Sequence, residues 1–209
     1  MDIVTLKSVK KYFSTGNQQI QAVDGVDLTI EKERFTAIVG ASGSGTTSLG
    51  KCLAAQLGYR HIDADDYFWL PPKYSFTKER LPKQRIQMLR QVLTDEGMWV
   101  LSGSLTGWGE ELFPLFDFAV LIYVPLDIRL ERLKKREWQR YGERMLPGGD
   151  RYEAEQEFLS WAACYDTGEQ SGRTFQKHKA DLEQFSCSTH QLENDVFETS
   201  LCQLLEWVK

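Results

Sequence analysis

The chain has 209 residues, of which 42% are hydrophobic, so its length and composition predict one domain of ordinary size with a buried core. The formal net charge of −5 provides no basic excess for binding nucleic acid. The four cysteines form no C-x-x-C pair, and the longest apolar run, residues 119–124, is too short to span a bilayer. We therefore expect a reduced, cytoplasmic protein without a zinc site or a membrane-inserted segment.

Residues 1–33 have the composition of β-structure. Three short β-rich runs are separated by turn-forming residues at 14–17 and at Asp24-Gly25. The runs cover residues 3–6, 19–23 and 26–30. We predict that residues 1–33 form a small β appendage and that residues 34–209 form a second, larger domain.

The second segment opens with an apolar run at residues 35–39, a glycine-rich bend, and then apolar residues at helical spacing up to Gly58. A strand, a loop and a helix in series are the context of the P-loop pattern G-x-x-x-x-G-K-[ST]. Its backbone N–H groups cradle phosphate while its last hydroxyl reaches Mg²⁺. We expect ATP and Mg²⁺ to bind through Gly40, Ala41, Ser42, Gly43, Ser44, Gly45, Thr46 and Thr47.

Thr46 stands where the P-loop pattern has lysine. The loop keeps its backbone anion site and the metal-ligand hydroxyl of Thr47, but it lacks the cation that contacts the β- and γ-phosphates. An ordinary glycine-rich turn between a strand and a helix is the alternative interpretation. Three glycines, two threonines and both flanking elements favour the phosphate loop over that alternative.

The rest of the chain alternates strands and helices. A short strand ends at a group of carboxylates, Asp63, Asp65 and Asp66. Further strands are predicted at 99–104, 118–124 and 188–192, and helices at 83–94, 127–141 and 196–208. Arg173 begins another helix, and we expect this arginine on the surface, with a further cation pointing at the site as the alternative. The pattern predicts an α/β fold of three layers with a mainly parallel five-stranded sheet, whose ligands lie outside the carboxyl ends of the strands.

The stretch from Leu6 to Phe13, together with residues 22–45, resembles the start of an ABC-transporter ATPase subunit. In that family an aromatic residue at the position of Tyr12 stacks on adenine, which is physically reasonable for an aromatic face. A tyrosine on an edge strand without a ligand is the alternative. The resemblance ends at the P-loop, because no glutamine loop, L-S-G-G-Q signature, Asp-Glu strand end or switch histidine follows.

From Gly40 onward the chain resembles the group of P-loop kinases that contains nucleoside-monophosphate kinases and shikimate kinases. The likeness is greatest to a set of bacterial adenylate-kinase-like ATPases whose P-loop reads G-A-S-G-S-G-T-T, as residues 40–47 do. The resemblance implies that Asp63 and Asp65 hold the water of Mg²⁺ and the acceptor hydroxyl. It also implies a lid whose arginines clamp the phosphates, and Arg132 and Arg136 have the spacing of those arginines.

These features predict a kinase that transfers the γ-phosphate of ATP to a small hydroxylated or nucleotide acceptor. The expected catalytic residues are Asp63, Asp65, Arg132 and Arg136, and the expected Mg²⁺ ligands are Thr47 and Asp63. A solvated loop would also explain the Asp-x-Asp. A solvated basic helix face would explain the row of arginines at helical spacing, Arg129, Arg132, Arg136 and Arg140. Two other functions stay open: a nucleotide-binding module without turnover, favoured by Thr46, and an ATPase component that docks on a membrane partner, favoured by residues 1–33.

Overall fold

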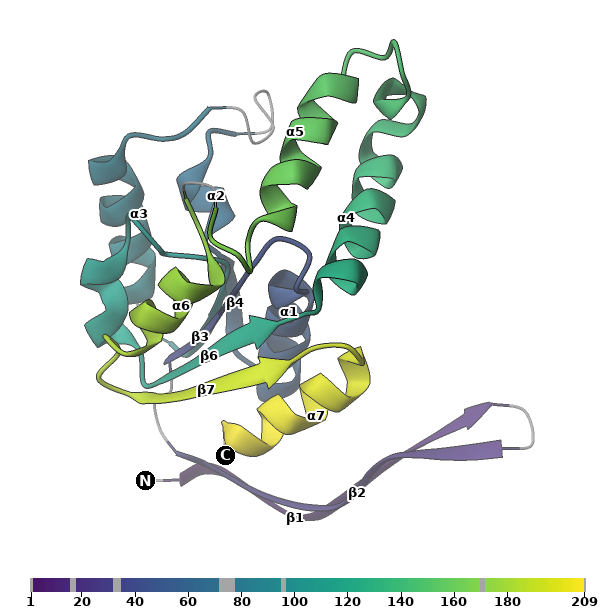
Figure 1. Cartoon of the computed structure of the whole chain (residues 1–209). Coiled ribbons are helices and arrows are strands. Elements are labelled where there is room, and N and C mark those ends of the chain that lie inside the picture. The colour runs from purple at the N-terminus through teal and green to yellow at the C-terminus, as the bar shows by residue number, and fades with distance from the viewer. Residues whose placement is uncertain are drawn as a thin grey trace.

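The computed structural model describes most of the chain (Figure 1), namely residues 2–15, 18–31, 35–71, 78–94, 97–169 and 172–208, with the backbone alone for residues 2–31. The N-terminal segment forms one antiparallel pair, β1 (Asp2–Thr15) and β2 (Gln18–Glu31). Asp24 and Gly25 were predicted as a turn, but they lie inside β2, in a stretch where the pairing with β1 shifts register. The predicted short runs therefore form one long hairpin, with its own two-stranded sheet.

The second sheet is parallel throughout. Its spatial order is β4 (Arg60–Asp63), β5 (Trp99–Ser102), β3 (Phe35–Gly40), β6 (Phe118–Tyr123) and β7 (Ser188–Glu193). The predicted five-stranded sheet is thus confirmed, and every neighbouring pair in it is parallel. β3 lies at the centre, so the carboxyl ends of all five strands meet at one edge around the loop that follows it.

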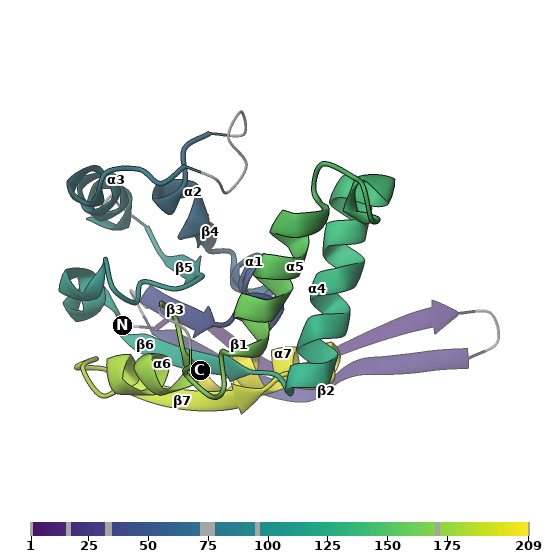
Figure 2. The same ribbon diagram turned by 45° about the horizontal axis from the view of Figure 1, so that its top comes forward.

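Helices cover both faces of this sheet (Figure 2), and the side chains of β3 alternate between the two layers. Ala37 and Val39 pack into a core cluster with α3 (Pro82–Thr94), α6 (Phe175–Leu182) and the 3₁₀ helix η2 (Glu110–Leu115). Ile38, between them, faces a second cluster with α1 (Thr46–Leu57) and α7 (Phe197–Trp207). Because successive side chains of a strand point to opposite faces, the apolar run of β3 holds both layers together. The predicted three-layer α/β fold is confirmed.

Two helices extend beyond the carboxyl edge of the sheet and lie side by side in both views (Figures 1 and 2). They are α4 (Leu126–Tyr141) and α5 (Tyr152–Ala163), and the short helix η3 (Gly142–Met145) follows α4. α4 begins after Pro125, so Asp127, predicted as its cap, lies in the first turn instead, where its charge still favours the helix dipole. Among the described residues, no helix has both the length and the apolar character that crossing a bilayer requires.

Candidate functional site

The glycine-rich loop turns tightly between β3 and α1. Gly43 and Gly45 both have φ of 85°, a conformation that residues with a side chain rarely adopt. A Cβ atom on Gly40 would lie 2.6 Å from Ser44 Oγ and 3.0 Å from Cγ2 of Thr46, the first residue of α1. The loop therefore lies directly against the N-terminal end of α1, where unpaired N–H groups and the helix dipole favour an anion.

Thr47 and Asp63, the two predicted metal ligands, lie together. Thr47 Oγ1 donates a hydrogen bond to Asp63 Oδ2 at 3.0 Å, and the backbone N–H of Asp65 donates to Asp63 Oδ1 at 3.0 Å. Hydroxyl and carboxylate oxygens are the hard ligands that suit Mg²⁺, which keeps several waters and needs few protein ligands. This donor set fits such an ion, although the described residues contain no group of three or more His, Cys, Asp or Glu arranged around a metal.

Asp65 begins α2 (Asp65–Phe68), and Arg173 lies beside it. Arg173 NH1 lies 3.9 Å from Asp65 Oδ1, and its guanidinium stands 5.1 Å from the centre of the Phe68 ring. Burial raises the pKa of the Asp65 carboxyl, and the charge of Arg173 opposes that rise. Of the two positions predicted for Arg173, the one on the surface is wrong, because the side chain is only 23% exposed and lies beside Asp65 instead.

A cavity of about 520 Å³ adjoins this pair. Phe68 and Trp108 form aromatic walls, and their rings meet edge to face at 5.7 Å. The cavity is lined by cationic and acidic side chains together, namely Arg85, Arg173, Lys177, Glu79, Glu110 and Asp181. Most of these charges already have a partner on the protein: Arg85, for example, pairs with Glu79 at 2.5 Å. The cavity can therefore hold a small molecule that has both an apolar body and polar groups.

The predicted lid arginines are bound to protein groups. Arg132 donates from NH1 to the carbonyl of Asn194 at 2.9 Å and from NH2 to that of Asp195 at 3.0 Å. Arg136 donates from Nε to Glu137 Oε1 at 2.6 Å, and its charge lowers the pKa of Asp65 after the larger effects of burial and Arg173. The structure thus brings Thr47, Asp63 and Asp65 together. Arg132 and Arg136 lie on α4, where they bind other groups of the protein.

Arg129 belongs to the same row in the sequence but has a different place. It is fully buried, and its NH2 group donates to Asp166 Oδ2 at 2.8 Å. A Cβ atom on Gly43 would lie 2.9 Å from the carbonyl oxygen of Arg129, so the start of α4 packs on the glycine-rich loop. The predicted basic face therefore does not include Arg129.

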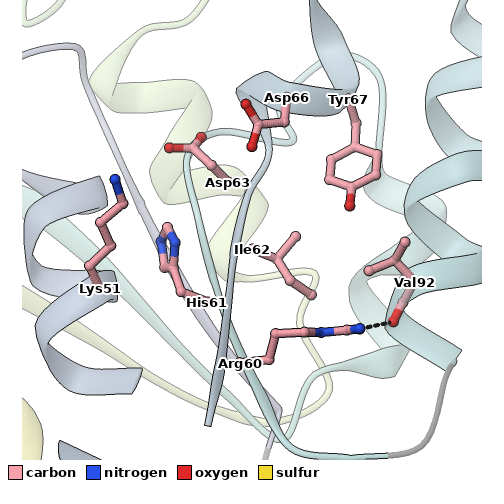
Figure 3. A pocket seen from close by; sticks show the side chains of 8 residues that line it. All are labelled: Lys51, Arg60, His61, Ile62, Asp63, Asp66, Tyr67 and Val92. Atoms are coloured by element: carbon pink, nitrogen blue, oxygen red, sulfur yellow. Dashed lines mark hydrogen bonds between the residues drawn. The ribbon is translucent and has the colours of Figure 1, made fainter. Parts of the chain in front are cut away.

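A second cavity, of about 370 Å³, lies beside the edge strand β4 (Figure 3). Lys51 of α1 points into the same opening as Asp63 and Asp66, and Arg60 donates to the carbonyl of Val92 at 2.5 Å. Burial raises the pKa of Asp66, as does the nearby Asp63. Lys51 is thus a further cation near the predicted metal ligands, one helical turn after Thr47.

Tyr12, predicted to stack on adenine, lies in β1 opposite Gln21. Its side chain is outside the described part of the structure, so the stacking stays a prediction.

Comparison with known proteins places these features in a family. The AAA domain family matches residues 37–158. The uncharacterized protein YqaC of Bacillus subtilis (strain 168) is 42% identical over 158 residues, which cover 76% of this chain and 87% of YqaC. The macrolide export ATP-binding/permease protein MacB of Hyphomonas neptunium is 49% identical over 47 residues, which cover 22% of this chain and only 7% of MacB. The likeness to transporter ATPases is thus confirmed as a partial one.

Solved structures show the same fold. The shikimate kinase of Bacteroides thetaiotaomicron has a TM-score of 0.55 at 20% identity, over 84% of this chain and 98% of that enzyme. The shikimate kinase of Acinetobacter baumannii has a TM-score of 0.50 at 14% identity, over 85% of this chain and 92% of that enzyme. The chain therefore has the α/β fold that these kinases share. Because the family match covers more than half of the 209 residues and the likeness to YqaC covers most of both proteins, the chain belongs to the AAA domain family.

Proposed function

We propose that this protein transfers the γ-phosphate of ATP to a small hydroxylated or nucleotide acceptor in a reaction that requires Mg²⁺. The observation that carries the proposal is the contact between Thr47 and Asp63. A hydroxyl at the start of α1 lies 3.0 Å from a carboxylate at the end of β4, and the same carboxylate accepts the N–H of Asp65. A phosphate loop, metal-binding oxygens and a second carboxylate, that of Asp65, therefore meet at the carboxyl edge of the sheet, where α/β proteins bind ligands.

Each residue has a role in this proposal. The triphosphate lies on Gly40–Thr47, and Thr47 and Asp63 hold Mg²⁺, which neutralises phosphate charge when it is bound. Asp65 orients the acceptor hydroxyl and accepts its proton, and burial assists this role because it raises the pKa of the carboxyl. Phosphoryl transfer depends on positioning and electrostatics more than on covalent help, so other cations can supply part of what the absent lysine would supply.

We assign the acceptor to the 520 Å³ cavity between α2 and α6. Its size favours a small molecule, and Arg173 links the cavity to Asp65 through their 3.9 Å contact. Arg136 supports the proposal as a lid cation, since its charge reaches Asp65. Arg132 would complete the lid, with its side chain held against the loop that follows β7.

A nucleotide-binding module without turnover is the second candidate, and Thr46 favours it. A P-loop without its lysine keeps the backbone cradle but loses a direct charge on the transferred group. An ATPase component that docks on a membrane partner is a third candidate, which rests on the 47-residue likeness to a transporter subunit. In all three cases we place the protein in the cytoplasm.

The test measures ATP loss with and without a panel of nucleosides, nucleoside monophosphates and small hydroxylated metabolites. Acceptor-dependent loss that disappears in Asp65→Asn, while calorimetry still shows ATP binding, supports the kinase. Binding without loss supports the module, and acceptor-independent loss supports the transporter-type ATPase. Gly45→Val should abolish ATP binding, because the residue has φ of 85° and its Cβ would lie 2.7 Å from Asn194 Nδ2. Thr46→Lys should tighten ATP binding. If the wild-type protein binds no ATP, the proposal is wrong.

A further inference from the structure

Asn194 lies between β7 and α7 and touches the phosphate loop from 150 residues away in the sequence. Its side-chain Nδ2 donates to the carbonyl oxygen of Ser44 at 2.7 Å, and Asn194 is 1% exposed. A carbonyl oxygen only accepts hydrogen bonds, so the NH₂ end of the amide must face Ser44. This bond joins the C-terminal part of the chain to the middle of the loop.

The position of Asn194 is itself held from two sides. Its backbone N–H donates to the carbonyl of Tyr123 on β6 at 2.8 Å, and its carbonyl accepts from Arg132 of α4 at 2.9 Å. The side chain therefore starts from a backbone that is tied to the central sheet. Its amide can hold Ser44 in place because its own anchor does not depend on the loop.

The geometry of the peptide bond shows what this contact does. The bond between Ser44 and Gly45 is trans and planar, so the carbonyl of Ser44 and the N–H of Gly45 point in opposite directions. Holding the carbonyl toward Asn194 turns the N–H of Gly45 away from it. Gly45 has φ of 85°, and a Cβ there would lie 2.7 Å from Asn194 Nδ2, so the amide packs against the turn that this glycine makes.

The cost of placing Asn194 here indicates a specific role. Within the described residues, its Oδ1 is buried without a hydrogen-bond partner, which is unfavourable. A small apolar side chain would avoid that cost but would leave the buried carbonyl of Ser44, a residue 0% exposed, without this donor. An aspartate of the same shape would place a carboxylate against that carbonyl.

We propose that Asn194 is a positioning residue that holds the lysine-free phosphate loop in its anion-binding conformation before a ligand arrives. The proposal rests on the proposed function, since it takes the loop to bind nucleotide phosphates. A loop that is already ordered loses less entropy on binding, so its backbone N–H groups bind phosphate more tightly. In a P-loop without its lysine, this ordering supplies affinity that a direct charge would otherwise supply.

The experiment compares full-length wild-type protein with Asn194→Ala, Asn194→Asp and Ser200→Ala. The hydroxyl of Ser200 lies 3.2 Å from the carbonyl oxygen of Glu193 and 3.0 Å from that of Val196, so its removal loosens the same β7–α7 loop without touching the phosphate loop. The first readout is hydrogen exchange of the amides of residues 43–47 without nucleotide, with the amides of 37–39 as an internal reference. The second readout is calorimetric binding of ADP with Mg²⁺.

Both Asn194 variants should speed exchange of residues 43–47 relative to 37–39 and weaken ADP binding by about tenfold, the effect of one lost buried hydrogen bond. Ser200→Ala should do neither. In a Thr46→Lys background, the loss caused by Asn194→Ala should shrink, because the lysine adds a charge that does not depend on loop order.

Unchanged relative exchange of residues 43–47 in both Asn194 variants would overturn the proposal. So would equal effects of the Asn194 and Ser200 variants, which would show that the amide only anchors the β7–α7 loop. Variants that speed exchange of both regions equally would overturn it too, because the effect would then be global. If the wild type binds no ADP, the proposed function fails, and the exchange measurement still decides the role of Asn194.

Discussion

His178 offers a direct test of how the buried polar groups contribute to stability. The residue is 1% exposed, its Nε2 lies 2.8 Å from Ser104 Oγ, and its Nδ1 lies 2.7 Å from the hydroxyl of Tyr165. Burial lowers the pKa of its imidazole from 6.5 to about 4, and the charge of Arg173 contributes to the shift. Both ring nitrogens thus serve as hydrogen-bonding groups of a neutral ring.

This shift makes folding stability depend on pH. The unfolded chain binds a proton at His178 near pH 6.5 and the folded chain only near pH 4, so between these values the unfolded state holds more protons. The stabilising contribution of the neutral His178 to the free energy of unfolding is present above pH 6.5 and is lost as the pH falls toward 4. Between pH 7 and pH 5 the loss from this one group is about 2 kcal/mol of unfolding free energy.

The assay is urea unfolding at pH 7 and pH 5 for wild type, His178→Gln and Ser104→Ala. Glutamine keeps an amide between the two hydroxyls but does not titrate. The unfolding free energy of His178→Gln should therefore change by about 2 kcal/mol less between pH 7 and pH 5 than that of the wild type. Ser104→Ala keeps the buried imidazole and should keep the steep dependence. Equal pH dependence in wild type and His178→Gln, or an imidazole that titrates near pH 6.5 by NMR, would refute the reasoning.

Three further predictions concern a buried ion pair, the lid arginines and the N-terminal hairpin. Arg129→Leu should lower the unfolding free energy by about 3–5 kcal/mol, because it leaves the partly buried Asp166 without its partner. The control is Arg90→Ala, which breaks an exposed ion pair and should cost about 0–1 kcal/mol in the same urea assay. Arg132→Ala or Arg136→Ala should reduce turnover by ~10³-fold, with lysine variants intermediate, and full activity in both alanine variants would reject the lid role. Deleting residues 1–32 should leave a cooperative melting transition, since β1 and β2 form a sheet of their own; loss of that transition would mean that the hairpin is integral.

Local signals in the amino-acid sequence are enough to predict several elements of the fold. The run from Phe35 to Val39 and its glycine-rich bend identified the strand, the phosphate loop and the start of α1, because a strand, a tight turn and a helix each have a pattern within a few residues. The apolar run before Pro125 likewise identified the strand that became β6. The same local rule placed a turn at Asp24-Gly25, where pairing with β1 instead continues the strand.

Contacts between residues far apart in the chain follow from tertiary packing instead. Arg129 and Arg132 are three residues apart on one helix, yet one is buried against Asp166 and the other binds the loop after β7. Arg173 reaches Asp65 across more than a hundred residues, and Asn194 reaches Ser44 across 150. No pattern near either residue indicates these contacts, because they depend on the order of strands in the sheet and on which face of each helix packs. Local patterns report what a segment can form, and packing determines where its side chains end.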